Sequence, residues 1–133
     1  GRPPDMQAAP HYADVCREVR SFFARELDRL SRAGLPEDRI VLDPGIGFGK
    51  TLAHNLALLA HVEEFLDFGR PLLVGLSMKL LFGELFGLPV EARGPITQTA
   101  AALLWERGVF WHRVHEVSGV KNALRLAGAL VRA

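Results

Sequence analysis

The sequence is poor in the features that would place a protein outside the cell, in a membrane or on nucleic acid. It has a single cysteine, Cys16, so no internal disulfide can form, and a reducing cytoplasm is the expected location. No run of about eighteen uncharged apolar residues is present, and no basic region precedes an apolar core at the amino terminus. Neither a membrane span nor a signal peptide is therefore expected. The formal net charge of +1 gives no long-range field that would attract nucleic acid or anionic lipid.

What the sequence does contain is typical of one globular domain. Its 133 residues are 49% hydrophobic and 23% charged, which is enough apolar material for a core. Residues 1–10 are polar and rich in proline, which predicts an extended loop and a start inside a larger protein. From Tyr12 to Leu30 the apolar residues recur at helical spacing. Cys16 lies on that apolar face, which favours a buried structural thiol over a nucleophile.

The rest of the chain is organised around residues 40–51. The apolar run at 40–42 is typical of a buried strand in a parallel sheet, and it stops at Asp43. Pro44 and the glycines at 45, 47 and 49 then indicate a loop shaped to pass close to a ligand. The glycine spacing fits neither the phosphate-binding P-loop nor the dinucleotide fingerprint, so ATP and NAD are not implied. Taken alone, Asp43 is explained equally well as the cap of a tight turn and as part of a site.

The order of a buried strand, a polar tip and a helix occurs three times. The strands are expected near residues 40–43, 71–75 and 109–114. Their polar tips are Asp43, Ser77 with Lys79, and Arg113 with His115. These tips recur at intervals of roughly 35 residues, the scale of successive βα units. The helices are expected over residues 12–30, 52–68, 80–88, 95–107 and 119–131. For His54, Asn55 and His61, hydrogen bonding at a helix start or solvent exposure is favoured over metal binding.

Parallel strands with polar tips at one edge occur in doubly wound sheets and in (β/α)8 barrels, and both bind ligands at that edge. A closed barrel needs eight strands and about 250 residues, so this chain would supply slightly more than its last three units. The expected fold class is therefore α/β, as the carboxy-terminal part of a TIM (β/α)8 barrel. Residues 1–133 would be the carboxy-terminal portion of a single domain whose amino-terminal strands are absent from this chain.

These residues resemble the carboxy-terminal half of dihydropteroate synthase, over nearly all of the chain. The family's segment D-P-G-I-G-F-x-K is present from Asp43 to Lys50 and is followed by His54 and Asn55. The signatures G-x-S-R-K and R-V-H-D-V are met imperfectly at residues 75–79 and 113–117. The earlier segment G-x-P-x-x-M-Q is met by Gly1, Pro3, Met6 and Gln7.

The resemblance implies an enzyme of folate biosynthesis. It would condense 6-hydroxymethyl-7,8-dihydropterin diphosphate with para-aminobenzoate to give 7,8-dihydropteroate and diphosphate. The resemblance also implies that Mg²⁺ shares the charge of the diphosphate and is held by residues outside this chain. It further implies a homodimer that forms through the carboxy-terminal helices. The 133 residues alone are expected to be inactive, because the amino-terminal half brings further substrate-holding groups.

The resemblance assigns roles to residues at all three polar tips. Pterin binding falls to Asp43, Lys79 and Arg113, and diphosphate binding to Arg113 and His115. Phe48 and Ser77 would help to form the para-aminobenzoate pocket. The chemistry agrees, because a pterin presents an amino group and a ring N–H side by side and a carboxylate can accept from both. Arg113 and His115 are expected on the same side of one strand, where both could donate to the leaving diphosphate.

Three positions depart from the family pattern. Met78 replaces an arginine, which removes a planar cation that could pack beside the pterin, while Leu80 and Glu116 are milder changes. Two other functions stay open. One is a methyltransferase domain that binds a methylated folate in a related barrel. The other is a pterin-binding paralogue that has lost catalysis and acts as a structural subunit.

Overall fold

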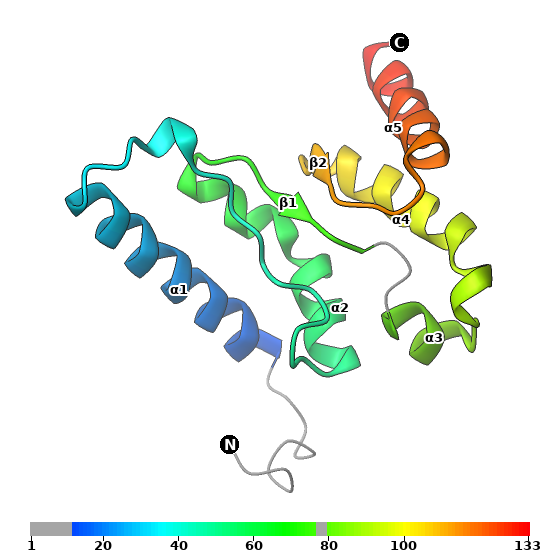
Figure 1. Cartoon of the computed structure of the whole chain (residues 1–133), viewed down its shortest axis with the longest axis horizontal. Coiled ribbons are helices and arrows are strands. Elements are labelled where there is room, and N and C mark those ends of the chain that lie inside the picture. The colour runs from blue at the N-terminus through cyan, green and yellow to red at the C-terminus, as the bar shows by residue number, and fades with distance from the viewer. Residues whose placement is uncertain (1–11, 77–79) are drawn as a thin grey trace, which may run out of the picture.

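The structure is a computed structural model that describes residues 12–76 and 80–133. Helices alternate with short parallel strands along the chain, and the strands lie inside a curved row of helices (Figure 1). The elements are α1 (Tyr12–Arg32), η2 (Glu37–Arg39), α2 (Leu52–Ala60), η3 (Val62–Phe68), β1 (Leu73–Val74), α3 (Leu80–Phe86), η4 (Val90–Ala92), α4 (Gly94–Glu106), β2 (Trp111–His112) and α5 (Val117–Arg132).

Three parallel segments of the chain lie side by side, as the sequence predicts. β1 pairs with β2, with Leu73 opposite Trp111 and Val74 opposite His112. On the other side of β1, Leu42 forms a single parallel bridge to Leu72. The regular pairing is shorter than the ranges 40–43, 71–75 and 109–114 predict. Prolines 44 and 71 have no N–H to donate, which limits the ladder at the first two segments.

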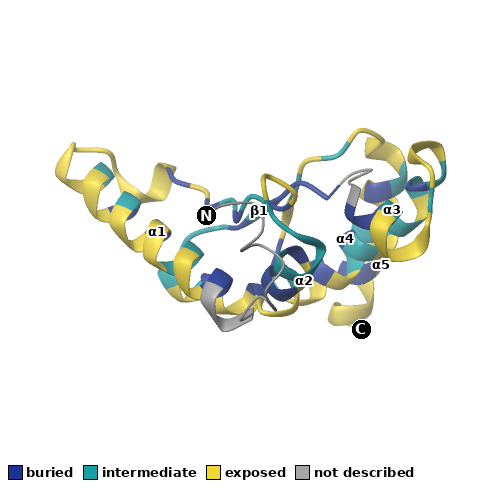
Figure 2. Ribbon diagram, turned by 90° about the horizontal axis from the view of Figure 1, so that it is seen from below, coloured by how far each residue is buried: buried dark blue, intermediate teal, exposed yellow. Residues whose placement is uncertain are grey.

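One hydrophobic core joins α1, the strands and α2. Phe23 of α1 packs edge-on against Phe65 and Phe68 of η3, with ring centroids 5.7 and 5.9 Å apart. The apolar spacing predicted this face of α1. Cys16 is buried on it with its Sγ 3.7 Å from the Ala57 carbonyl, which confirms a structural thiol. Figure 2 shows that buried residues gather where the helices meet the strands, whereas the outer face of α1 is exposed.

The helix predicted over residues 52–68 is two helices in the structure. α2 ends at Ala60, His61 takes φ −112° and ψ 23°, and the 3₁₀-helix η3 follows. The apolar residues Val62, Phe65 and Phe68 explain the change, because a spacing of three matches the 3.0 residues per turn of a 3₁₀-helix. Val62 and Phe65 are fully buried there. Gly69 ends η3 in the left-handed region, at φ 69°, as its position predicted.

The last helices pack on each other. Pro95 occupies the first turn of α4, and α5 begins at Val117, two residues before the predicted start. Glycines allow the close approach, since a Cβ at Gly119 would collide with Gln98 and one at Gly128 would touch the Trp105 ring at 3.4 Å.

Within the described residues, no helix is both long and apolar enough to cross a bilayer.

Candidate active site

The ends of the three parallel segments bring Asp43 and Arg113 together. The backbone N–H of Arg113 donates to the Val74 carbonyl at 3.1 Å, so the pairing of β2 with β1 continues one residue past His112. From there the Arg113 side chain crosses the end of β1, and its Nη1 lies 3.4 Å from Asp43 Oδ2. Both side chains remain accessible, at 56% and 32% exposure. An anion and a cation from residues 70 positions apart thus share one face of the sheet edge.

Asp43 serves the loop and the site at once. Its Oδ1 accepts a hydrogen bond from the Gly45 N–H at 2.8 Å, which is the turn cap that the sequence left as an alternative. Its Oδ2 faces Arg113. Each carboxylate oxygen can accept a second hydrogen bond, so this cap leaves acceptor capacity for a ligand.

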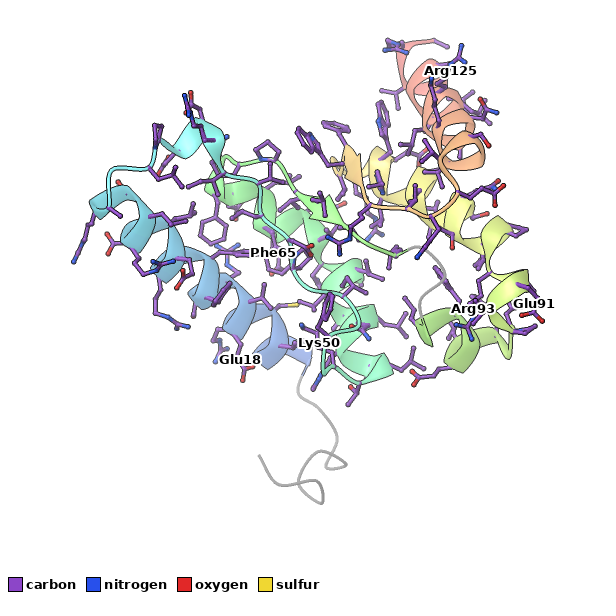
Figure 3. The ribbon with its side chains drawn as sticks, viewed as in Figure 1. Glu18, Lys50, Phe65, Glu91, Arg93 and Arg125 are labelled. Carbon is purple, nitrogen blue, oxygen red and sulfur yellow. The ribbon has the colours of Figure 1, made fainter. Side chains whose placement is uncertain are left out.

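The Lys50 side chain is hydrogen-bonded to the backbone of its own glycine-rich loop. Its Nζ donates to the Gly45 carbonyl at 2.7 Å, and it lies beside the start of α2 (Figure 3). Burial lowers the pKa of the Lys50 ammonium, and the charge of Asp43 opposes that shift. The lysine of this loop is therefore bonded to backbone carbonyls of the loop itself.

The loop is fixed to α2 by a residue whose role the sequence did not reveal. Asn55 is buried, with 4% exposure, and its Oδ1 accepts from the Gly47 N–H at 2.9 Å. The cap of α2 is Thr51, whose Oγ1 accepts from the His54 backbone N–H at 3.1 Å. One feature of the sequence could have indicated this role of Asn55, because it is a polar residue on the core-facing side of a helix that is predicted to be apolar there.

The other predicted site residues are placed differently or lie outside the description. Phe48 is on the loop and 65% exposed. His115 is exposed at a bend beyond β2, so the prediction that it shares a strand with Arg113 is wrong; regular pairing ends before it. Ser77 and Lys79, like Met78, lie outside the described residues.

Histidine 112, which the sequence analysis did not single out, is the titratable group of β2. Its Nε2 lies 2.8 Å from the Val109 carbonyl, so a neutral ring protonated at Nε2 donates to it. Burial lowers the pKa of His112, and the bond to Val109 partly offsets this. His112 belongs to the packing of β2.

In the parts of the chain that the structure describes, no three His, Cys, Asp or Glu side chains gather closely enough to hold an ion. His61 Nδ1 lies 3.5 Å from Glu64 Oε1, and among the described residues no third side chain of these types joins this pair.

The curated relatives of the chain are dihydropteroate synthases. The enzyme of Escherichia coli strain K12 is 39% identical over 133 residues, which are 100% of this chain and 47% of that protein. The enzyme of Neisseria meningitidis serogroup C is 41% identical over 132 residues, 98% of this chain and 47% of that protein. The chain therefore spans about half the length of the curated relatives it matches.

Solved structures give the same result. Dihydropteroate synthase from Xanthomonas albilineans in complex with 7,8-dihydropteroate superposes with a TM-score of 0.88 at 39% identity, over 94% of this chain and 48% of that one. A Yersinia pestis dihydropteroate synthase with a sulfonamide drug complex gives 0.88 at 37% identity, over 99% and 48%. The family model described as "Pterin binding enzyme" matches residues 1–115. The chain, with its carboxylate and guanidinium meeting at the ends of parallel strands, belongs to the family of pterin binding enzymes.

Proposed function

We propose that the whole protein carrying this chain is a dihydropteroate synthase. It would join 6-hydroxymethyl-7,8-dihydropterin diphosphate to para-aminobenzoate and release diphosphate. The chain would form the carboxy-terminal part of a (β/α)8 barrel. The observation that carries this proposal is the meeting of Asp43 and Arg113, 3.4 Å apart, at the ends of adjacent parallel segments. Such barrels bind substrates at that edge.

The pterin would bind through the carboxylate of Asp43. Its two oxygens would accept from the amino group and the ring N–H of the pterin, and charged acceptors make the stronger hydrogen bonds. The Gly45 N–H, 2.8 Å from Oδ1, fixes the carboxylate plane before the substrate arrives. Arg113 faces the same carboxylate, with Nη1 3.4 Å from Oδ2, and could also lie beside the pterin ring. Lys79 would donate to the ring carbonyl and the neighbouring nitrogen.

The chemical step exchanges one bond for another at the pterin methylene carbon. The carbon–oxygen bond to diphosphate breaks, the aniline nitrogen of para-aminobenzoate forms the new carbon–nitrogen bond, and that nitrogen loses a proton. Negative charge develops on the departing diphosphate, where cationic donors stabilise the transition state. Arg113 and His115 would supply these donors, while Phe48 and Ser77 would line the para-aminobenzoate pocket.

Mg²⁺ stays a prediction of this proposal, with its ligands outside this chain. When bound, it would share the diphosphate charge. Cytoplasmic location is proposed in the same way, and the free thiol of Cys16 supports it because thiols persist in reducing compartments.

We propose that the protein is a homodimer through α4 and α5. A groove of about 470 Å³ lies between these helices. Three leucines at this surface, Leu103, Leu126 and Leu130, are 59%, 61% and 64% exposed. A second copy of the same surface is the proposed occupant, because most soluble oligomers are symmetric dimers whose interfaces pair one patch with itself.

Binding and turnover by the whole protein test the proposed function. Asp43→Asn should weaken binding of the dihydropterin diphosphate about a hundredfold, since a hydrogen bond to a charged group contributes about 1.5–3 kcal/mol. Asp67→Asn is the matched control, because Asp67 is an exposed carboxylate that also faces an arginine, Arg20 at 3.4 Å. It should leave binding unchanged.

The same measurements separate the other candidates. Binding of the dihydropterin diphosphate without release of diphosphate would point to the non-catalytic paralogue, the alternative that Met78 suggests. Binding of a methylated folate without condensation would point to the methyltransferase. Absence of pterin binding by the unmodified protein would overturn the proposal. The 133-residue chain alone is predicted to show no turnover.

A further inference from the structure

The loop at residues 43–50 needs specific hydrogen bonds to keep a single conformation. It has no regular hydrogen-bond ladder, and Gly45, Gly47 and Gly49 take φ values of 72°, 91° and 63°. Glycine loses more conformational freedom on folding than any other residue, so a loop of this composition is intrinsically loose. Its fixed conformation must come from particular bonds.

The two halves of the loop are held in different ways. The first half is held by the loop's own side chains, because Asp43 Oδ1 accepts from the Gly45 N–H at 2.8 Å and Lys50 Nζ donates to the Gly45 carbonyl at 2.7 Å. The second half is tied to the first by two longer bonds, since the Phe48 N–H donates to the Gly45 carbonyl at 3.3 Å and Lys50 Nζ lies 3.4 Å from the Phe48 carbonyl. It is also held from the helix. The Gly47 N–H donates to Oδ1 of Asn55 at 2.9 Å, eight residues further along the chain.

Asn55 is well placed for that task and is not needed for capping the helix. It is 4% exposed in the first turn of α2, next to Ala57 and Leu58, which are 6% and 0% exposed. The cap of α2 is Thr51, whose hydroxyl accepts from the His54 N–H. A buried amide is costly unless it is hydrogen-bonded. The bond to Gly47 is therefore a rigid link from the core to the loop.

We propose that Asn55 is a positioning residue that holds Gly47 and thereby sets the place of Phe48. Phe48 is 65% exposed and directly follows Gly47 in the chain, so the path of the backbone at Gly47 sets where its ring is presented. The inference rests on the proposed function, in which Phe48 meets para-aminobenzoate and Asp43 meets the pterin. Because Asp43 is anchored separately through Gly45, loss of Asn55 should affect the two substrates unequally.

Steady-state kinetics of the whole protein test whether the loss of Asn55 affects the two substrates unequally. Asn55→Leu, which keeps the branched shape of the side chain and removes the acceptor, should raise the KM for para-aminobenzoate about tenfold. The KM for the dihydropterin diphosphate should stay within about twofold. Asn55→Asp keeps an acceptor oxygen and should recover most of the lost affinity. Asn55→Ser, too short to reach Gly47, gives the same readout should Asn55→Leu fail to fold.

Thr51→Ala is the matched control. It removes the cap of the same helix but leaves the Gly47 bond in place, so it lowers stability without moving the loop. Both KM values should stay within about twofold of the unmodified protein. An equal rise of both KM values in Asn55→Leu, or a para-aminobenzoate effect of the same size in Thr51→Ala, would overturn the inference.

Amide hydrogen exchange makes the inference independent of the reaction. Exchange at Gly47 should be at least about tenfold faster in Asn55→Leu and unchanged in Thr51→Ala. Should the unmodified protein fail to condense the two substrates, the proposed function fails while this readout still decides the role of Asn55. Unchanged exchange at Gly47 in Asn55→Leu would show that the amide does not hold the loop.

Discussion

The guanidinium of Arg113 lies directly over the Cα of Gly75, so that a Cβ added there would be 2.6 Å from Nη2 and 3.1 Å from Cζ. Gly75 follows β1, between the segments that carry Asp43 and Arg113. The missing side chain is what lets the arginine cross the sheet edge to Asp43.

Gly75→Ala is therefore expected to push the guanidinium away from Asp43. In the whole protein, kcat/KM for the dihydropterin diphosphate should fall roughly tenfold to a hundredfold, since the displaced group makes charge-assisted hydrogen bonds. Gly94→Ala is the control, because a Cβ at Gly94 meets Glu116 at an ordinary 3.5 Å. Steady-state kinetics of both variants give the comparison.

A double-variant cycle shows whether Gly75 acts through Arg113. In a protein that already carries Arg113→Ala, the additional change Gly75→Ala should have little further effect, because the colliding group is gone. A full additional loss in that background would mean that the alanine disturbs β1 itself.

The core beneath the site depends strongly on Phe65. This ring is fully buried and packs edge-on against Phe23, between α1 and the strands (Figure 3). Phe65→Ala should lower the free energy of unfolding by about 3–5 kcal/mol, because a cavity adds to the lost burial. Chemical denaturation measures it. Phe22→Ala, at a ring that is 50% exposed, should cost less than about 1 kcal/mol, and an equal cost at both sites would contradict the described packing.

The ends of the strands could be predicted from the sequence, whereas the hydrogen bonds that hold the loop at residues 43–50 could not. A buried apolar run that stops at a carboxylate marks Asp43, and parallel connections bring Arg113 to the same edge. The position of His115 was mispredicted because the alternation of side chains along a strand, with its period of two residues, does not show where the hydrogen-bonded pairing of the strands ends. The role of Asn55 was not predicted because its partner, Gly47, is set by the path of the loop and not by helical spacing. The role of Gly75 was not predicted either, because it depends on a side chain from a different strand.

The pH dependence of stability should carry a contribution from His112. Its pKa is lowered in the folded protein by burial, so below a pH of about 6.5 the unfolded chain binds a proton more readily than the folded one. The free energy of unfolding should therefore fall as the pH drops from about 6.5 through the folded pKa. His112→Gln, whose amide can still donate to the Val109 carbonyl, should lack this contribution. Urea unfolding at pH 7.5 and at pH 5.5 measures the difference between the two proteins, and equal pH dependence would contradict it.

The exposed leucines of α5 give the proposed dimer a direct test. In a symmetric interface each substitution occurs twice, and burying a leucine contributes about 1.5–3 kcal/mol. Leu126→Glu should therefore raise the dimer dissociation constant at least about a hundredfold, because it also places a charge in an apolar contact. Sedimentation velocity over a range of concentrations measures this. Leu85→Glu on α3, at a leucine that is 43% exposed and away from the α4–α5 groove, is the control and should leave the dimer intact. A protein that sediments as a monomer without any substitution, or a dimer that survives Leu126→Glu unchanged, would rule out this surface as the interface.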